Sequence, residues 1–482
     1  MGRPHILLIT TDQHRAGFTL GDGFLLDTMP AVDALGAAGR RLRQAYTTAP
    51  ACVPARTSLL TGRWPKAHRV RQNSAENAVV RGDDLLDVLR GQGYAVHFAG
   101  KPHMYRGPDD FDSYAGSYWH DHGPAGDAED DGFARWLAEL DHGVSPVATP
   151  YPLRSQFPHR IVSAAVETVR AIDRPSFLWA SFPEPHNPYQ VPEPYFSMFP
   201  EESIPAPLTG RVDALAKGGA YAWLADLQES KRPGLGKQWR RYRANYCGML
   251  RLIDDQIARL IASYRERGIL DDTVVIVTSD HGDYTGEYGL QRKGAGMPEV
   301  LMRVPFVISG AGIAVYDDDA TIFSLADLMP TLAELAGAKI PLGVQGRSLA
   351  PVLGSHEPGG PGFESVYAER GVGGLPYPAD ARPPLHFDYD GPSFDELNTV
   401  TQSGDTKMLR RGRWTLLYDA QGAGELYDLY ADPVELTNLF ADPGCSAIHA
   451  AMVEELLCWS IRLDDELPDA AYTTLRAPHN WR

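Results

Sequence analysis

Short apolar runs that alternate with segments of helical periodicity set the tightest limit on how this chain can fold. The runs are almost continuously apolar, whereas a strand with one face in water would alternate apolar and polar residues. Continuous runs are typical of strands that are buried on both faces of a mostly parallel sheet. The predicted strands cover residues 6–10, 95–99, 177–181, 274–278 and 304–308.

Helices are predicted in the stretches between these runs. One starts at Pro30, because proline suits the first turn of a helix, and it extends through Arg43. A longer helix is predicted over residues 243–267, where apolar residues recur on one face and Gly268 provides a stop. Strands that alternate with helices predict an α/β fold, here a large mixed, mostly parallel sheet flanked by helices.

The character of the sequence changes after about residue 355. Glycine and proline are dense over residues 358–392, which predicts loops. Two short strands are predicted within residues 407–418, a third over residues 425–429, and a closing helix over residues 448–462. We therefore predict a large domain over residues 1–365 and a smaller C-terminal α+β subdomain, built on an antiparallel sheet, over residues 366–482.

The 482-residue chain is acidic, with 45 basic and 62 acidic residues and a formal net charge of −17. An acidic surface repels nucleic acid and anionic membranes, so neither is expected as a partner. Four cysteines are too few for a disulfide framework, and without a Cys-x-x-Cys pair a structural zinc site is not expected. The first apolar run is too short for a signal peptide, and no run approaches the ~18 apolar residues of a membrane helix. We therefore expect a cytoplasmic protein.

Polar side chains follow four of the predicted strands at the point where each strand ends. In an open α/β sheet the carboxyl ends of parallel strands meet at one edge, and ligands bind there. Each motif alone is weak, since a strand followed by Asp is most often a simple turn. Four together would be an unusual coincidence and predict a functional site. The residues are Asp12, Gln13, Lys101, His103, His186, Asn187, Asp280 and His281.

Four of these residues, Asp12, Gln13, Asp280 and His281, are predicted ligands for one hard divalent cation. Carboxylate and amide oxygens suit Ca²⁺, Mg²⁺ or Mn²⁺, and one imidazole is compatible with these ions. We expect Ca²⁺, with Mn²⁺ or Mg²⁺ as alternatives. The competing interpretation is that residues 280–282 form only a turn.

The segment Cys52-Val53-Pro54-Ala55-Arg56 predicts the start of a helix, because Pro54 suits a first turn. The free N–H groups and the dipole at a helix N-terminus favour an anion near Cys52. Arg56 lies one turn along and can face the same point. The alternative is a purely structural role, in which Cys52 is a small buried apolar residue. A tyrosine-phosphatase loop is excluded, because it needs arginine at position 58, where this chain has Ser58.

Together these segments resemble the sulfatases, a branch of the alkaline-phosphatase superfamily. The resemblance runs in order from about residue 5 to residue 440, and its motifs are specific in combination. It implies an alkaline-phosphatase-like catalytic domain over residues 1–365 and a hydrolase that cleaves sulfate monoesters. The matching segments are residues 52–56, 59–63, 100–103, 278–283, 286–290 and 425–439, together with Lys293.

The resemblance also implies that a maturation enzyme oxidises Cys52 to formylglycine, which is then hydrated. One hydroxyl of the hydrate, bound to the metal, would attack the sulfur of the ester, and the other would expel sulfate. Asp280 would help to deprotonate the hydrate, and Arg56 would hold it. The substrate would be a small-molecule sulfate ester, and by analogy with related enzymes the chain would form a homo-oligomer.

Further residues are placed on the substrate side of the site by the same resemblance. Lys101 and Lys293 would bind the sulfate oxygens, and His103 would assist the second hydroxyl. His186 would bind sulfate or protonate the leaving alcohol. Asn73 resembles a family residue that touches substrate, and a structural loop role is equally open.

One departure from the family pattern keeps an alternative open. Many sulfatases supply two adjacent aspartates from the first strand, whereas this chain has Asp12 and the neutral Gln13, which should weaken metal binding. The same pair occurs in phosphonate monoester hydrolases and in choline-sulfatase-like members. A phosphonate monoester or phosphodiester hydrolase is therefore the runner-up. Those enzymes lack the Gly-Lys-x-His segment, so Lys101 and His103 favour the sulfatase. A non-catalytic sulfate-sugar binding protein is disfavoured, because every implied catalytic residue is present.

Overall fold

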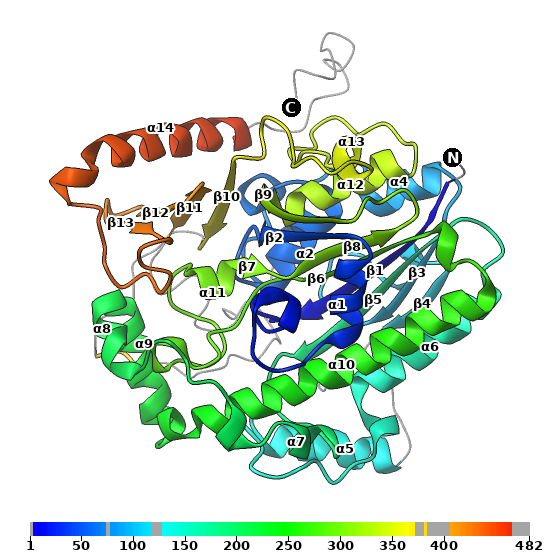
Figure 1. Cartoon of the computed structure of the whole chain (residues 1–482), viewed down its shortest axis with the longest axis horizontal. Coiled ribbons are helices and arrows are strands. Elements are labelled where there is room, and N and C mark those ends of the chain that lie inside the picture. The colour runs from blue at the N-terminus through cyan, green and yellow to red at the C-terminus, as the bar shows by residue number, and fades with distance from the viewer. Residues whose placement is uncertain (1–2, 74–77, 117–127, 372–379, 383–404, 465–482) are drawn as a thin grey trace.

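The computed structural model describes residues 3–73, 78–116, 128–371, 380–382 and 405–464. A large sheet with helices on both faces is followed by a smaller C-terminal antiparallel sheet (Figure 1). The predicted α/β fold with a mixed, mostly parallel sheet is therefore confirmed. In the described part of the chain no helix is both long and apolar enough to cross a membrane. All four cysteines lie in that part and are free thiols.

The large sheet has nine strands in the order β4-β3-β5-β1-β6-β8-β2-β7, and β9 pairs with β2. β1 is central and runs parallel to β5 and β6, while β3 and β4 extend the parallel part. β8 runs antiparallel to β6 and begins the mixed part. The strands are β1 (His5–Asp12), β2 (Arg40–Tyr46), β3 (Ala95–Gly100), β4 (Ser113–Gly116), β5 (Ser176–Pro185), β6 (Thr273–Ser279), β7 (Arg303–Val304), β8 (Phe306–Gly310) and β9 (Tyr316–Ser324).

Both faces of β1 are buried, which explains why its sequence is continuously apolar. Leu7 and Ile9 belong to one hydrophobic core together with residues of α6 and α10. Ile6 and Leu8 belong to a second core together with residues of α2, α4 and α12. Successive side chains of a strand point to opposite faces, so each helix layer covers one set. These helices are α2 (Cys52–Thr61), α4 (Leu85–Gly91), α6 (Phe157–Ala171), α10 (Trp239–Arg267) and α12 (Leu328–Leu335).

The helix predicted from Pro30 through Arg43 is too long. Helix α1 ends at Ala37, and residues 40–43 belong to strand β2. β2 pairs with β8 and β9, which lie far away in the sequence, and this tertiary pairing outweighs local helical periodicity. Gly39 marks the change, because a side chain there would collide with the backbone of β8 at Ile308 and Ser309.

Two further boundaries differ from the prediction. The apolar run over residues 304–308 is divided at Pro305 into β7 and β8, since proline has no N–H to donate to a strand ladder. These strands are antiparallel to their neighbours, not part of the parallel core. Helix α10 begins at Trp239, four residues before the predicted start at 243. The two arginines of its first turn, Arg240 and Arg241, lie over the rings of Trp239 and Phe196.

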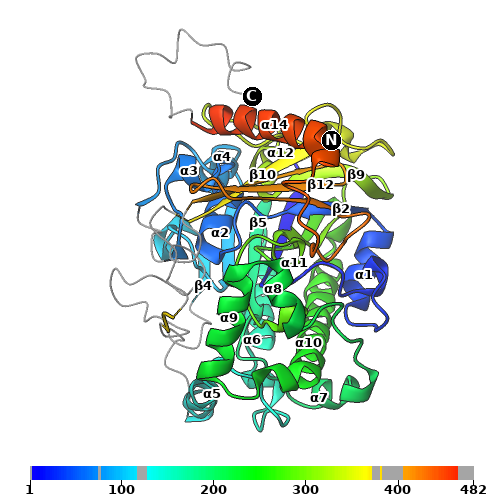
Figure 2. The ribbon, with the colours of Figure 1, turned by 90° about the vertical axis from the view of Figure 1, so that its left-hand side faces the viewer.

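The C-terminal sheet has four antiparallel strands in the order β10-β11-β12-β13, and α14 lies across it (Figure 2). The two short strands, the third strand and the closing helix are confirmed, whereas β10 was not predicted. Trp64 of the loop after α2 shares a core with this sheet, and its indole donates to the Tyr367 carbonyl over 2.8 Å. The division of the chain at residue 365 stays a prediction. The elements are β10 (Ser365–Arg370), β11 (Thr406–Arg411), β12 (Trp414–Asp419), β13 (Gly424–Asp428) and α14 (Ser446–Leu463).

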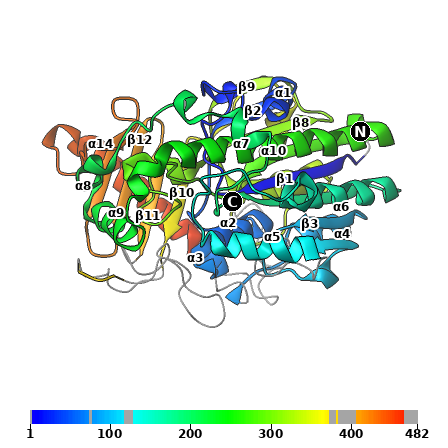
Figure 3. The same ribbon diagram turned by 90° about the horizontal axis from the view of Figure 1, so that it is seen from below.

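Helices α6 and α10 run next to each other along the same face of the large sheet (Figure 3). The remaining helices lie in the connections between the strands. They are α1 (Pro30–Ala37), α3 (Pro65–His68), α5 (Ala128–Glu139), α7 (Tyr195–Met198), α8 (Ala214–Lys217), α9 (Gly219–Lys231), α11 (Glu299–Met302) and α13 (Ala350–Leu353).

Candidate active site

The carboxyl ends of β1 and β6 and the first residue of α2 meet at one point. Asp12 is the last residue of β1, Asp280 and His281 follow β6, and Cys52 opens α2. One ligand atom of each of these four residues lies within 4.8 Å of the others, and all four residues are buried. The predicted convergence of strand ends thus forms a compact group of acid, imidazole and thiol.

The Cys52 thiol is surrounded by the other groups of this site. Its sulfur lies 3.3 Å from Nε2 of His281, 3.1 Å from Nζ of Lys293 and 3.6 Å from Oδ1 of Asp12. Burial, followed by the Asp12 carboxylate, raises the pKa of the thiol to about 12. The sulfur is therefore protonated at neutral pH, unlike the thiolate of a cysteine hydrolase.

Arg56 lies one helical turn after Cys52 and holds the two carboxylates in place. Its Nε donates to Oδ2 of Asp280 over 2.9 Å, and Nη2 donates to Oδ2 of Asp12 over 3.3 Å. Nη1 donates to the Ser181 hydroxyl over 2.7 Å. Burial by itself lowers the pKa of the guanidinium, but the charges of Asp280 and Asp12 outweigh burial and raise this pKa. A planar fork of donors suits this arrangement of several acceptors around one centre.

Gln13 follows Asp12 in the left-handed region of backbone conformation, with φ 66°. Its side-chain amide nitrogen donates to Asp283 over 2.6 Å and to the Tyr189 hydroxyl over 3.1 Å. Among the groups that the structure describes, Oε1 of Gln13 is buried and has no hydrogen-bond partner. A buried oxygen of this kind needs a partner that the protein groups do not supply, which a metal ion could provide.

A divalent metal ion fits the donors present in this group. The Nδ1–H group of His281 donates to the Gly282 carbonyl over 2.9 Å. The neutral imidazole therefore has its lone pair on Nε2, the nitrogen that lies on the Cys52 side of the site. Burial and Lys293 lower the pKa of His281, which keeps the imidazole neutral. Two carboxylates, one amide oxygen and one imidazole would hold the ion: Asp12, Asp280, Gln13 and His281.

Lys101 and Lys293 both bring positive charge to the site: Lys101 contacts Asp12, and Lys293 contacts Cys52. Lys101 follows Gly100, which lies so close to the Ser181 backbone that any side chain at position 100 would collide with it. The Lys101 ammonium donates to Oδ2 of Asp12 over 2.6 Å. Burial raises the pKa of the Asp12 carboxyl, but the charges of Lys101 and Arg56 hold it well below its usual value.

The predicted histidines His103 and His186 also belong to this edge of the sheet. The side chain of His186 is buried, and its Nδ1–H group donates to the Asn187 carbonyl over 2.9 Å. His103 is half-buried, with φ 35°, a strained conformation that is found most often at functional sites. Burial, reinforced by Lys101, lowers the pKa of both imidazoles well below the usual value, so both are neutral without a bound anion.

Asn73 lies at the start of α2, next to Cys52. Its side-chain oxygen accepts from the backbone N–H of Val53 over 3.0 Å, and its amide nitrogen lies 3.8 Å from the Cys52 sulfur. The side chain therefore satisfies a free N–H of the helix and touches the site as well. This position is compatible with both interpretations of Asn73, a contact with the substrate and a structural role in its loop.

Three residues that organise the site were not predicted. Asp283 accepts from Gln13, Ser181 links Arg56 to Lys101, and Tyr189 bonds the Gln13 amide. Asp283 stands inside the segment 278–283, so its acidic side chain was a usable signal. Ser181 ends a predicted strand, whereas Tyr189 carries no local signal, because only the fold brings it to Gln13.

Comparison with known proteins places this site in a family. Residues 4–338 match the family model described as Sulfatase. The multifunctional alkaline phosphatase superfamily protein PehA of Trinickia caryophylli is 29% identical, over 96% of this chain and 96% of that protein. The arylsulfatase of Clostridium perfringens is 28% identical, over 91% and 90% of the two chains. The phosphonate monoester hydrolase of Agrobacterium radiobacter superposes with a TM-score of 0.80 at 25% identity, over 98% and 97% of the two chains.

Proposed function

The chain belongs to the sulfatase family of sulfuric ester hydrolases, and from that premise we propose that it hydrolyses small-molecule sulfate monoesters through a formylglycine made from Cys52. The observation that carries this proposal is the position of Cys52. It opens a helix, it contacts Lys293 and His281, and it lies beside the carboxylate of Asp12. When hydrated, formylglycine would supply one hydroxyl to attack sulfur and a second to release sulfate.

We propose one divalent ion, Ca²⁺ by preference and Mn²⁺ or Mg²⁺ as alternatives, held by Asp12, Gln13, Asp280 and His281 with position 52 as a further ligand. The ion would stabilise negative charge and lower the pKa of the nucleophile. Arg56 fixes Asp12 and Asp280, and so fixes two of the predicted metal ligands. Without this fork the two buried carboxylates would lose the cation that they share.

The positive charges of Lys101 and Lys293 favour an anionic substrate in the proposed site. The chain as a whole carries a formal charge of −17, which repels anions at long range. Lys101 and Lys293 supply local positive charge within the buried site, where screening by salt is weak. We assign both ammonium groups to the sulfate oxygens, and Asn73 to the same side of the site.

Proton transfer is assigned to the two neutral imidazoles. The hydrogen bond of His186 to the Asn187 carbonyl requires a proton on Nδ1, so a second proton is taken up at Nε2. A bound sulfate ester brings negative charge, and a nearby opposite charge raises the pKa of an imidazole. His186 can then protonate the leaving alcohol, and His103 can assist sulfate release.

A phosphonate monoester hydrolase is the second candidate, and two observations favour it. The neutral Gln13 stands where many sulfatases have aspartate, and the Agrobacterium radiobacter phosphonate monoester hydrolase matches the fold over nearly its whole length. The segment of Lys101 and His103 supports the sulfatase instead. A cytoplasmic location, a formylglycine-generating maturation enzyme as partner and a homo-oligomer stay predictions from the sequence.

The test is a comparison of kcat/KM for 4-nitrophenyl sulfate and 4-nitrophenyl phenylphosphonate. The chain is co-produced with a formylglycine-generating enzyme, loaded with Ca²⁺ or Mn²⁺, and compared with Cys52→Ala from the same preparation. A mass spectrum of the peptide with residue 52 shows whether the CH₂SH group has become an aldehyde. A sulfate preference of several orders of magnitude supports the sulfatase. A preference for the phosphonate supports the second candidate, and equal activity of Cys52→Ala would exclude both.

A further inference from the structure

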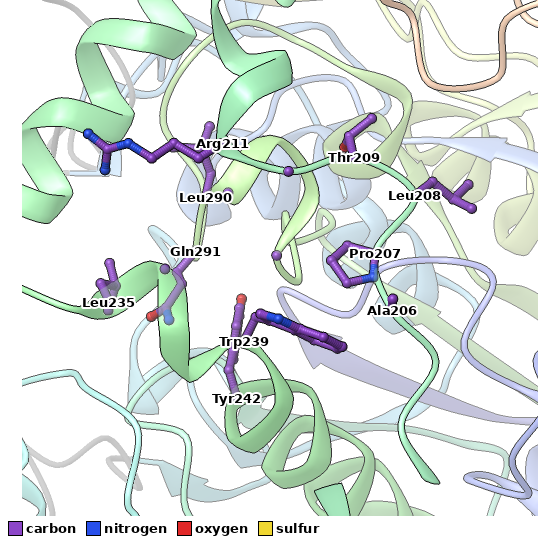
Figure 4. A pocket seen from close by; sticks show the side chains of 14 residues that line it. Ala206, Pro207, Leu208, Thr209, Arg211, Leu235, Trp239, Tyr242, Leu290 and Gln291 are labelled. Carbon is purple, nitrogen blue, oxygen red and sulfur yellow. The ribbon is translucent and has the colours of Figure 1, made fainter. Parts of the chain in front are cut away.

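A cavity of about 380 Å³ lies between the loop 206–211, the start of α10 and the loop 286–291 (Figure 4). Its volume falls within the range of small-molecule sites, roughly 300–1,000 Å³. The described residues that line it include none of those in the candidate active site. Most of its walls are apolar, and they are formed by Pro207, Leu208, Leu235, Trp239 and Leu290.

The polar groups of this cavity are nearly all occupied by the protein itself. Thr209 donates its hydroxyl to Glu287 over 2.7 Å. The guanidinium of Arg211 pairs with Asp226 over 2.6 Å, so its charge is already balanced. The hydroxyl of Tyr242 donates to Asp283. A charged molecule would lose its hydration here without gaining an unpaired partner, so the walls favour an uncharged one.

Gln291 is the exception among the lining residues. Its side chain is only 6% exposed, and within the described part of the chain its amide nitrogen has no hydrogen-bond partner. Figure 4 shows this amide on the cavity wall, between the side chains of Leu235 and Tyr242. The backbone of Gln291 is fixed on both sides by Gln228, so the amide cannot easily move away. A buried donor of this kind needs an acceptor.

We propose that this cavity is a second ligand site, which binds an uncharged one-ring or two-ring molecule whose carbonyl or ether oxygen accepts from Nε2 of Gln291. A cavity of about 150 Å³ is enough for benzene, so this one has room for a larger ring compound. Trp239 and Leu290 supply apolar contact area, and Gln291 fixes the orientation. This inference does not depend on the reaction proposed for the active site.

The site is adjacent to the metal ligands but distinct from them. Tyr242 forms one wall, its hydroxyl contacts Asp283, and Asp283 accepts from the amide of Gln13. The molecule in the cavity is thus separated from Gln13 by two side chains. Sulfate in the active site should therefore not displace it.

Acetophenone is the probe that tests this site, with α-methylstyrene as its counterpart in which CH₂ replaces the carbonyl oxygen. Binding to the full chain is measured by titration calorimetry or by ligand-observed NMR. Acetophenone should bind with one molecule per chain, and Gln291→Met should weaken it about 5-fold, the effect of one lost hydrogen bond. The same substitution should leave α-methylstyrene unchanged, because that molecule makes no hydrogen bond to Gln291.

Trp239→Ala removes an apolar wall and should weaken both probes, whereas Trp414→Ala, in the C-terminal sheet, should weaken neither. If Trp239→Ala does not fold, Gln291→Met decides alone, because it keeps the size of the side chain. Three outcomes would overturn the proposal. They are no binding of acetophenone at millimolar concentration, binding that Gln291→Met leaves unchanged, or displacement of acetophenone by saturating sulfate.

Discussion

The side-chain amide nitrogen of Gln13 donates to the carboxylate of Asp283 over 2.6 Å, and this bond leaves the amide oxygen for the proposed metal ion. The nitrogen faces Asp283, so Oε1 is turned away from it. Asp283 is held in turn by the hydroxyls of Tyr189 and Tyr242. Burial raises the pKa of Asp283, and these donors act against that shift. The neutral side chain of Gln13 is thus held by the acidic side chain of Asp283.

Asp283→Ala should weaken metal binding although Asp283 is not one of the proposed ligands. Without the carboxylate, the Gln13 amide loses the shorter of its two side-chain hydrogen bonds and keeps only the one to Tyr189. The loss of a group that orients a ligand typically costs about 10- to 100-fold in affinity. The affinity for Mn²⁺ and Ca²⁺ is measured by titration calorimetry. Tyr246→Phe is the matched control, because the hydrogen bonds of the Tyr246 hydroxyl are to backbone groups and not to the Gln13 side chain. It donates to the Gln13 carbonyl over 2.8 Å and accepts from the Arg15 N–H over 2.9 Å. Equal affinity of Asp283→Ala and the unaltered protein would remove Gln13 from the ligand set.

Substitutions of Cys52 should separate chemistry from metal binding. Cys52→Ala should abolish turnover but keep most of the metal affinity, because Asp12, Asp280 and His281 remain. Cys52→Ser has one hydroxyl, which can accept the sulfuryl group but has no second hydroxyl to expel sulfate. Rapid mixing with 4-nitrophenyl sulfate should therefore give at most one equivalent of 4-nitrophenol and then stop. Steady turnover by Cys52→Ser at the original rate would contradict the need for an aldehyde.

The parallel core of the fold could be predicted because its strands are buried on both faces. Continuous apolar runs such as residues 6–10 identify such strands without knowledge of their partners. β2 could not be predicted in this way. Its sequence, Arg40–Tyr46, is rich in arginine and continues a helical pattern, and it becomes a strand only through distant pairing with β8 and β9. Arg40 is buried there against Asp318, which local sequence cannot reveal.

The candidate site was predictable to the extent that it follows strand ends and one helix start. Asp12, Cys52 and Asp280 each occupy such a position, so local patterns were sufficient to group them. The side chains that hold these residues in place could not be grouped from local patterns. Tyr189 and Ser181 reach the site only after the chain has folded, and neither belongs to a recognisable motif.

Arg56→Lys should destabilise the protein as well as inactivate it. Arg56 is 1% exposed and donates to Asp280, Asp12 and Ser181, which a single ammonium cannot reproduce. Loss of hydrogen bonds to charged groups should lower the free energy of unfolding by about 2–3 kcal/mol. Urea unfolding measures this change. Arg170→Lys, in an exposed pair with Glu167, is the control and should change stability by less than about 0.5 kcal/mol. If both variants were equally stable, the guanidinium fork would not support the site.

Glu184 is a buried acid next to His186 that the proposed reaction does not use. Its side chain lies at the end of β5 and is 5% exposed. No described group bonds its Oε2. Burial raises the pKa of this carboxyl to about 8, with Lys101 acting against the shift and Asp12 adding to it. It shares a small cavity with His186, Asn187 and Gln190.

Glu184→Gln should therefore change how stability depends on pH. Between the usual pKa of 4.5 and about 8 the unfolded chain is ionised at this position while the folded chain keeps its proton. The free energy of unfolding should fall as pH rises through this interval, by roughly 5 kcal/mol in all, and should level off above it. Glu184→Gln lacks this decrease, so its advantage should be absent near pH 4 and complete by pH 9. Urea unfolding at pH 5, 7 and 9 gives the difference, with the exposed Glu202→Gln as the control. A difference that stays constant from pH 5 to pH 9 would mean that Glu184 ionises normally in the folded protein.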